Sequence, residues 1–378
     1  MRDLFLLDPE VVFLNHGSFG ACPRPVFEAY QDWQRQLERQ PVEFLGRRIE
    51  GLLEKARSDL GVFVGAKPEN LTFVHNATGA INMVARSLNL RPGEEVLTTD
   101  HEYGACDMTW DYLCAQSGAS YVRASIPLPI SGDDEFLERL WAAVTPRTRV
   151  IFISHLTSPT GVIFPVKEVC RRAREAGIVT VIDGAHAPGQ LPLDLETLGA
   201  DYYTGNLHKW LNAPKGSALL YVRPEHQTSL IPLVISWGFQ PGATLAARTQ
   251  WMGTEDPSAY LSVSAAIAFQ NAHDWPSVRA RCHQLAVTWR DKGCALYQQP
   301  PLAPESWLGQ MAAIRLPERY TADQAPEIKR RLYDEYRVEA PVIVWGDRVL
   351  VRASFQGYNT AEDGEALLQA LSSVAPKG

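Results

Sequence analysis

The feature that most constrains the fold is a regular alternation, from about residue 71 to residue 222, of short β-branched runs with amphipathic segments. This spacing suits βαβ units, in which a helix links two parallel strands. Apolar residues recur at helical spacing in 80–88, 133–144 and 166–176. The sequence therefore predicts an α/β fold with a mostly parallel, doubly wound, seven-stranded sheet and helices on both faces. The expected strands are 71–74, 95–99, 120–124, 149–154, 179–183, 202–204 and 218–222.

A chain of 378 residues accommodates a large domain and a smaller one. The stretch 237–257, which contains Pro and Gly, predicts a long loop, and an Ala- and Ser-rich helical segment follows it. We expect an N-terminal segment of residues 1–25 that packs near the functional site, a large domain of residues 26–260, and a small α+β domain of residues 261–378.

Composition excludes several classes of protein. The net charge is -7 and no dense Lys/Arg block occurs, which argues against nucleic-acid binding. No run approaches the roughly 20 apolar residues of a membrane span, and the N-terminal apolar run is too short for a signal peptide. The six cysteines show neither a CxxC pair nor zinc-like spacing. We expect a cytoplasmic protein without a metal site, whose partners are small molecules or a second copy of itself.

Two polar residues follow neighbouring strands of the predicted sheet. Asp183 ends the apolar run 178–182, and Lys209 follows the next strand. Ligands of open α/β sheets bind beyond the carboxyl ends of the strands. A lysine amine can hold an aldehyde as a Schiff base, and a buried carboxylate can keep a pyridine nitrogen protonated. Alone, Lys209 would be a solvated lysine and Asp183 a turn cap. Together they predict the two ends of a pyridoxal 5'-phosphate (PLP) site.

A phosphate loop is expected after the strand at 71–74. The turn at 75–80 opens a helix, whose free amides and positive dipole end suit a phosphate. Thr78 and Gly79 are the candidate cofactor-binding residues of this turn, and the Thr78 hydroxyl would add a donor. The alternative is that Thr78 only caps the helix.

Three further polar residues lie near the Asp183 and Lys209 motifs. His186 is expected to hydrogen-bond the phenolic oxygen of the cofactor or the Schiff base, and Asn206 and His208 to reach the phosphate. Either histidine could instead be structural, as isolated histidines often are.

Long sequence runs resemble the fold-type I PLP enzymes of the aminotransferase class V family, and within it the isopenicillin N epimerase-like sequences. The resemblance covers most of the chain. It implies a fold-type I PLP-dependent transferase fold, but it leaves the reaction open, because epimerase-like sequences also include carbon-sulfur lyases such as cysteine desulfhydrases. The runs are Leu14-Asn-His-Gly-Ser-Phe-Gly20, Asp100-His-Glu-Tyr-Gly-Ala105, Thr157-Ser-Pro-Thr-Gly161, Asp183-Gly-Ala-His-Ala-Pro-Gly189 and Tyr203-Thr-Gly-Asn-Leu-His-Lys-Trp-Leu211.

The resemblance also implies roles for individual residues. His101 would lie on the cofactor ring, with Tyr103 as the competing choice. Thr254, in a Gly-Thr pair, would complete the phosphate site of the other subunit, which implies a homodimer with shared active sites. Arg352 would grip the α-carboxylate of an amino acid substrate, because a guanidinium pairs with a carboxylate through two parallel hydrogen bonds.

Asn15 and His16 form an alternative carboxylate site. His16 is also, with His101 and Tyr103, a candidate second acid across the ring from Lys209.

Two departures from the cysteine desulfurase pattern bear on the reaction. Ser158 stands where those enzymes carry an asparagine near the cofactor, and the stretch 336–342 lacks the cysteine that forms their persulfide. These differences disfavour sulfur transfer, although direct elimination of sulfide needs no such thiol.

The resemblance therefore leaves three reactions that start with loss of the Cα proton to Lys209. Return of a proton from the opposite face gives epimerisation, which we predict for an amino acid or a peptide-like amine. The alternatives are β-elimination by a carbon-sulfur lyase and class V transamination. A PLP-binding sensor without catalysis is disfavoured, because Lys209, Asp183 and Arg352 are all present and no DNA-binding segment is appended.

Overall fold

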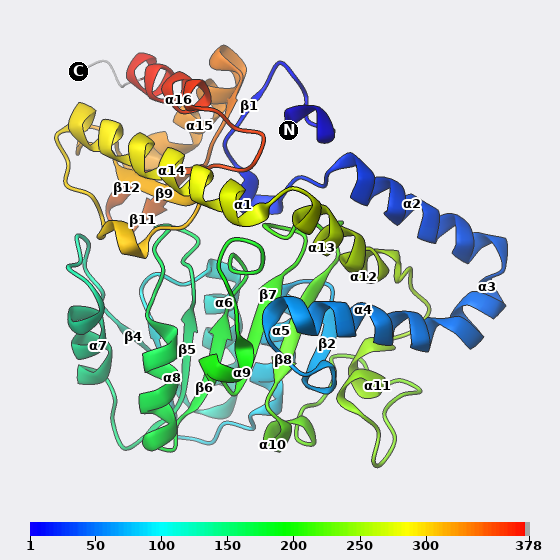
Figure 1. Cartoon of the computed structure of the whole chain (residues 1–378). Coiled ribbons are helices and arrows are strands. Elements are labelled where there is room, and N and C mark those ends of the chain that lie inside the picture. Colours follow the sequence, from blue (N-terminus) through cyan, green and yellow to red (C-terminus); the bar gives the residue numbers. More distant parts are fainter. Residues whose placement is uncertain (375–378) are drawn as a thin grey trace.

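The computed structural model describes residues 1–374 of the chain and contains a seven-stranded sheet in the order β2-β8-β7-β6-β5-β3-β4 (Figure 1). Strand β8 is antiparallel to both of its neighbours, and all other neighbouring strands are parallel. The predicted α/β fold with a mostly parallel sheet is confirmed. The strands are β2 (Leu71–Val74), β3 (Glu95–Thr99), β4 (Ser120–Ala124), β5 (Thr148–Ser154), β6 (Val179–Asp183), β7 (Tyr202–Asn206) and β8 (Ala218–Val222).

Alternate residues of the central strands belong to two different cores. On β5, Ile151 and Ile153 join one hydrophobic cluster, and Val150 and Phe152 join another. Successive side chains of a strand point to opposite faces, so helices on both faces bury both sets. The helices of this region are α5 (Ala77–Ser87), α6 (Gly104–Ser117), α7 (Asp133–Ala142), α8 (Val166–Glu175), α9 (Leu195–Leu198), α10 (Pro224–Gln227) and α11 (Leu245–Gln250). Helix α11 interrupts the expected loop at 237–257.

A smaller part built on an antiparallel sheet, β11-β12-β9, lies above the large sheet in Figure 1. It comes from the region predicted to form the small domain, whose boundary at residue 260 stays a prediction. Its strands are β9 (Met311–Arg315), β10 (Val338–Glu339), β11 (Val342–Trp345) and β12 (Arg348–Ser354). Its helices, with those leading into it, are α12 (Ser258–Leu261), α13 (Val263–Ala272), α14 (Trp275–Tyr297), α15 (Ala325–Tyr336) and α16 (Ala361–Ser373).

The N-terminal segment joins this smaller part. Strand β1 (Val12–Phe13) pairs in parallel with β10, and helix α1 (His16–Phe19) follows it. The chain then continues through α2 (Arg24–Arg39), α3 (Pro41–Glu43) and α4 (Ile49–Val64). Among the described residues, no helix combines the length and apolar character that a membrane crossing requires.

Two glycines pack directly on the segment that carries Lys209. Gly20 has φ +72, and a Cβ there would lie 2.1 Å from the His208 carbonyl oxygen and 2.9 Å from the Lys209 Cα. Gly189 has φ +88, and its Cβ would lie 2.4 Å from the Trp210 carbonyl carbon. Both positions need a glycine for their backbone conformation and for the close approach. The N-terminal segment and the loop after β6 thus both pack closely against the backbone of the Lys209 segment.

We expect Gly20→Ala to destabilise the protein far more than Gly177→Ala. Gly177 also has a positive φ, +69, but open space around the added Cβ. The control should therefore cost only the left-handed strain of about 1–2 kcal/mol. Gly20→Ala should add a further ~1–3 kcal/mol, because backbone atoms must shift. Urea unfolding of the two apoprotein variants measures the difference in the free energy of unfolding. Equal losses of stability in the two variants would show that the backbone of the Lys209 segment can shift at little cost.

Candidate active site

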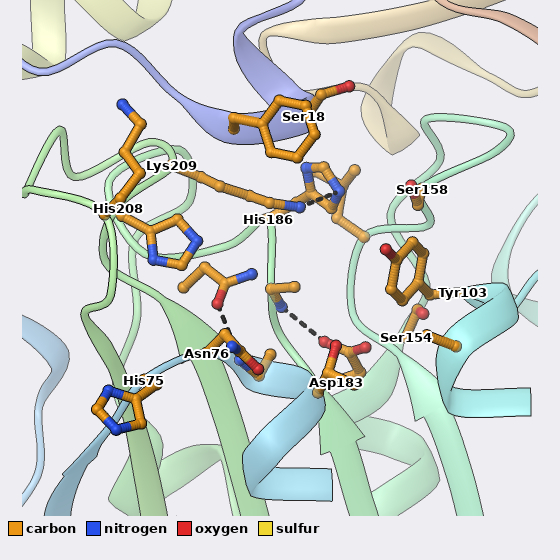
Figure 2. Close-up of a pocket in the computed structure, with 18 of the residues that line it drawn as sticks. Ser18, His75, Asn76, Tyr103, Ser154, Ser158, Asp183, His186, His208 and Lys209 are labelled. Atoms are coloured by element: carbon orange, nitrogen blue, oxygen red, sulfur yellow. Dashed lines mark hydrogen bonds between the residues drawn. The ribbon is translucent and has the colours of Figure 1, made fainter. Parts of the chain in front are cut away.

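A cavity of about 530 Å³ opens at the carboxyl ends of β5, β6 and β7 (Figure 2). Ser154, Asp183 and Asn206, the last residues of these three strands, all lie on its wall. This is the place where open α/β sheets bind ligands. The other lining residues are Ser18, Phe19, His75, Asn76, Ala77, Thr78, Tyr103, Ala105, Leu156, Ser158, Ala185, His186, His208, Lys209, Lys215 and Gly216.

Lys209 lies in the turn after β7, and its amine points into the cavity beside His186 (Figure 2). The distance from Lys209 Nζ to His186 Nε2 is 3.2 Å. Burial of the amine, and then the positive charge of Arg352, lower the pKa of Lys209 to about 7. A substantial fraction of the amine is therefore uncharged at neutral pH, as a nucleophile or a base must be.

The neighbours of His186 determine its tautomer. Its Nδ1 lies 3.3 Å from Nε1 of Trp210, and an indole N–H can only donate. Burial holds the pKa of His186 well below its usual value, so the ring is neutral. A neutral ring that accepts at Nδ1 carries its proton on Nε2. His186 therefore donates toward Lys209 Nζ, and this contact favours an uncharged lysine.

Asp183 faces the cavity without a cationic partner among the described residues. Its Oδ1 accepts the Ala185 N–H at 2.8 Å, and the Cys106 thiol lies 3.6 Å from Oδ2. Burial raises the pKa of Asp183, because a charged carboxylate is costly away from water. A protonated pyridine nitrogen in the cavity would supply the missing positive charge.

Helix α5 begins at the wall of the cavity, and its first turn differs from the prediction in detail. Asn76 is its N-cap: Asn76 Oδ1 accepts the Gly79 N–H at 2.8 Å. Thr78 is therefore not the cap, and it lies on the cavity wall. Gly79 is not on the wall, and its amide is already used. The predicted cofactor contact of Gly79 is corrected for this reason.

Asn206 and His208 flank the same end of the cavity. Asn206 Oδ1 accepts the Ala77 N–H at 2.9 Å, so Asn206 fixes the start of α5. His208 Nδ1 is buried and has no hydrogen-bond partner among the described residues. Burial lowers the pKa of His208 to about 4. An unpartnered buried nitrogen is unfavourable unless a ligand satisfies it, and a phosphate group would do so.

Arg352 on β12 is a buried cation with no carboxylate in salt-bridge distance among the residues described. Its side chain bonds to the Ser158 carbonyl, and its Nη atoms lie 3.3 Å from Ser158 Oγ and 3.4 Å from Ser18 Oγ. In the described part of the chain, Arg352 Nε has no hydrogen-bond partner, and burial lowers the pKa of Arg352 to about 10. An unpaired buried charge is strongly unfavourable. Because Ser18 and Ser158 lie on the cavity wall, a carboxylate that enters there would pair with the guanidinium.

The structure does not place His101 in the cavity. Its side chain is fully buried, with Nδ1 2.9 Å from Thr160 Oγ1 and Nε2 2.7 Å from the Ile126 carbonyl. Both ring nitrogens are thus used, and the expectation that His101 covers the cofactor ring or acts as an acid is corrected. Tyr103, the competing choice, precedes the first turn of α6 and lies on the cavity wall.

Asn15 and His16 also lie outside the cavity wall, which corrects their predicted contact with the substrate. His16 bonds to the Tyr358 hydroxyl at 2.9 Å and to the Lys209 carbonyl at 3.0 Å. Burial lowers the pKa of His16 to about 3, so it supplies no proton. Asn15 donates to Glu339 Oε1 at 2.9 Å. Both residues support α1, whose Ser18 and Phe19 do line the cavity.

Thr254 is exposed and lies outside the cavity wall of its own chain. Its neighbour Glu255 is 3.0 Å from His75 Nε2, and His75 is on the wall. The contribution of Thr254 to another subunit stays a prediction.

Sequence reasoning missed Ser154 as a residue of the cavity wall. Strand register could have found it, because Ser154 on β5 pairs with Asp183 on β6.

The residues of the cavity fit PLP in three places. Asp183 offers a carboxylate for the ring nitrogen, and Lys209 offers an amine for the aldehyde. The start of α5, with Thr78 and the unpartnered His208 nitrogen, offers donors for the phosphate.

Comparison with known proteins agrees with this geometry. Isopenicillin N epimerase of Amycolatopsis lactamdurans is 36% identical, with 99% of this chain and 98% of that protein covered. L-cysteine desulfhydrase of Arabidopsis thaliana is 28% identical, with 96% and 88% covered.

Solved structures show the same fold. A cystine C-S lyase, C-DES, in complex with cysteine persulfide has a TM-score of 0.84 at 22% identity, with 97% of this chain and 99% of that chain covered. A cysteine desulfurase of Thermococcus onnurineus has a TM-score of 0.82 at 21% identity, with 99% and 97% covered. The profile of the family described as "Aminotransferase class-V" matches residues 18–292. The chain therefore belongs to the aminotransferase class-V family, whose enzymes use PLP.

Proposed function

We propose that this protein is a PLP-dependent epimerase, which removes the Cα proton of an amino acid or a peptide-like amine and returns a proton to the opposite face. The observation that carries this proposal is the placement of Lys209 and Tyr103, which enter the cavity from opposite sides (Figure 2). Inversion needs two proton-transfer groups, one on each face of the substrate.

Asp183, Thr78, His208 and Lys209 would hold the cofactor at its ring nitrogen, phosphate and aldehyde. When bound, PLP accepts the electron pair that remains on Cα after the proton leaves. Asp183 maintains the positive charge on the ring nitrogen that this role requires.

Lys209 acts as the base at Nζ. A pKa of about 7 gives it both an uncharged fraction and enough basicity near neutral pH. The N–H of His186 at 3.2 Å keeps the amine turned into the cavity. Arg352 binds the α-carboxylate and thereby fixes which substituent of Cα faces Lys209.

Tyr103 acts as the acid on the other face. Tyr103 is 46% exposed, so its side chain is not buried in the core. Elimination would not need this second acid, and this difference separates the epimerase from a carbon-sulfur lyase.

We also propose that two copies associate and that Thr254 of each reaches the phosphate end of the other cavity. Three exposed, large apolar side chains support this proposal: Phe19 on the cavity wall is 73% exposed, Met108 on α6 is 74% exposed, and Trp237 between α10 and α11 is 86% exposed. Exposed apolar side chains of this size often mark a contact with a partner.

The reaction itself is tested with PLP-loaded protein and a series of L-amino acids and short peptides in D2O. We expect the opposite enantiomer with deuterium at Cα and no keto acid. Borohydride reduction should couple PLP to the peptide that contains Lys209, and Lys209→Ala should abolish both results. Keto acid and ammonia from a β-substituted substrate such as cysteine would instead establish the lyase.

Replacing Tyr103 should separate proton removal from inversion. We expect Tyr103→Phe to lower the inversion rate about 100-fold or more, the usual contribution of a general acid. Exchange of the Cα proton with solvent deuterium, with retention of configuration, should continue because Lys209 is intact. Chiral analysis and mass spectrometry of the same samples give both rates. An equal fall in the two would assign Tyr103 to cofactor binding alone.

Arg352→Lys should weaken binding of α-amino acids. An ammonium cannot reproduce two parallel hydrogen bonds, and loss of one charge-assisted bond costs about 1.5–3 kcal/mol. We therefore expect KM to rise by roughly 10- to 100-fold. Amines without a carboxylate serve as controls and should bind the variant as well as the parent protein. A uniform loss for amines and amino acids would make Arg352 structural.

A further inference from the structure

Glu102 is a buried carboxyl group behind the cavity wall that the proposed reaction does not use. It is 6% exposed and does not line the cavity. Its Oε1 lies 2.7 Å from Thr99 Oγ1, so a protonated Oε1 can donate to that hydroxyl oxygen. Its Oε2 lies 2.8 Å from the Ser154 amide nitrogen and 2.6 Å from Ser154 Oγ. In the part of the chain that the structure describes, no Lys, Arg or His side chain forms a salt bridge with it.

Its position ties three parts of the site together. Ser154 and Asp183 are paired residues at the ends of β5 and β6, and both lie on the cavity wall. Glu102 thus binds the end of β5, at the residue that pairs with Asp183 on β6. It also directly precedes Tyr103, so its bonds to Thr99 and Ser154 fix the turn from which Tyr103 reaches the cavity.

The surroundings of Glu102 disfavour its ionisation, which would place a second negative charge beside Asp183. The ionisable side chains that face it are Asp183 on β6, Cys106 on α6 and Tyr121 on β4, and none of these can be positive. Asp183 lies on the cavity wall, where a cationic group of a ligand can pair with it. Glu102 does not line the cavity, so no such group can reach it. Burial raises the pKa of Glu102 to about 8, and the neighbouring charge of Asp183 acts in the same direction.

We propose that Glu102 is a positioning residue that works as the neutral acid: it holds Ser154 and the turn carrying Tyr103 in place without adding a second negative charge beside Asp183. The inference about positioning rests on the proposed function. The protonation of Glu102 does not, because it concerns the apoprotein as well.

Glu102→Gln is the direct test, because glutamine keeps the shape and the neutral charge. One amide oxygen can accept both bonds from Ser154, and the amide N–H₂ can donate to Thr99 Oγ1. We expect PLP affinity and turnover near neutral pH within about threefold of the parent protein. Glu102→Ala loses the bonds to Thr99 and Ser154. We expect it to lower the inversion rate at least about tenfold while it still binds PLP, as judged from its absorbance spectrum.

Stability of the apoprotein gives a readout without any reaction. A carboxyl whose pKa is raised on folding retains a proton that the unfolded chain releases. The stability that this proton contributes is complete below the ordinary pKa of a glutamate and is lost as the pH rises to about 8. The melting temperature of the parent apoprotein should therefore fall, relative to that of Glu102→Gln, between about pH 5 and pH 8.

Glu95→Gln is the matched control, because the pH dependence of stability that comes from Glu95 is expected to have the opposite sign. Glu95 is also buried on the large sheet, but its bonds to Thr145 and then Arg147 lower its pKa. Its stabilising contribution is present above the ordinary glutamate pKa and is lost as the pH falls. Glu95→Gln should therefore lose stability relative to the parent protein at neutral pH.

Three results would overturn the proposal. The first is a parallel pH dependence of melting in the parent and Glu102→Gln apoproteins. The second is a Glu102→Gln protein that fails to fold or loses PLP as Glu102→Ala does, since a neutral isostere should fit. The third is a Glu102→Ala protein with unchanged inversion. If the parent protein shows no epimerase activity, the proposed function fails, but the melting comparison still decides whether Glu102 is neutral.

Discussion

The constraint that shapes the site is the burial of three ionisable side chains without salt-bridge partners around one cavity. Asp183, Lys209 and Arg352 are each removed from water, yet none forms a salt bridge with an oppositely charged side chain among the described residues. Such charges oppose folding, and the two hydrophobic cores on either face of the sheet must offset them. A protein retains such an arrangement where a ligand supplies the missing partners. A cofactor with a basic ring nitrogen and an aldehyde, together with a substrate carboxylate, would supply a partner for each of the three residues.

The sequence was sufficient to predict most of the fold because two patterns dominate it, the short β-branched runs of buried strands and the helical spacing of apolar residues. Buried strands produce short β-branched runs, and all seven strands of the large sheet were recognised between residues 71 and 222. Asp183 and Lys209 were placed in one site because the carboxyl ends of neighbouring parallel strands meet at one edge of the sheet. The short helix α11 was missed, because Pro and Gly near it indicate a loop.

The direction in which a side chain points was harder to predict than the position of its backbone. His101 and Tyr103 are two residues apart in the turn after β3, yet the first points into the core and the second toward the cavity. His16 lies near Lys209 in space, but it contacts the backbone of the lysine rather than its amine. Sequence motifs bring such residues to the right region without fixing their orientation.

The Lys209 segment combines a fixed backbone with a free amine. Gly20 and Gly189 allow two other backbone segments to approach it closely, and His16 donates to the Lys209 carbonyl from the N-terminal segment. His16 in turn bonds to Tyr358, which belongs to the smaller part of the molecule. These contacts leave the side chain of Lys209 as the part that can move. The proposed role of Lys209 as a base would need this combination, because a fixed backbone would keep Nζ within reach of one substrate atom.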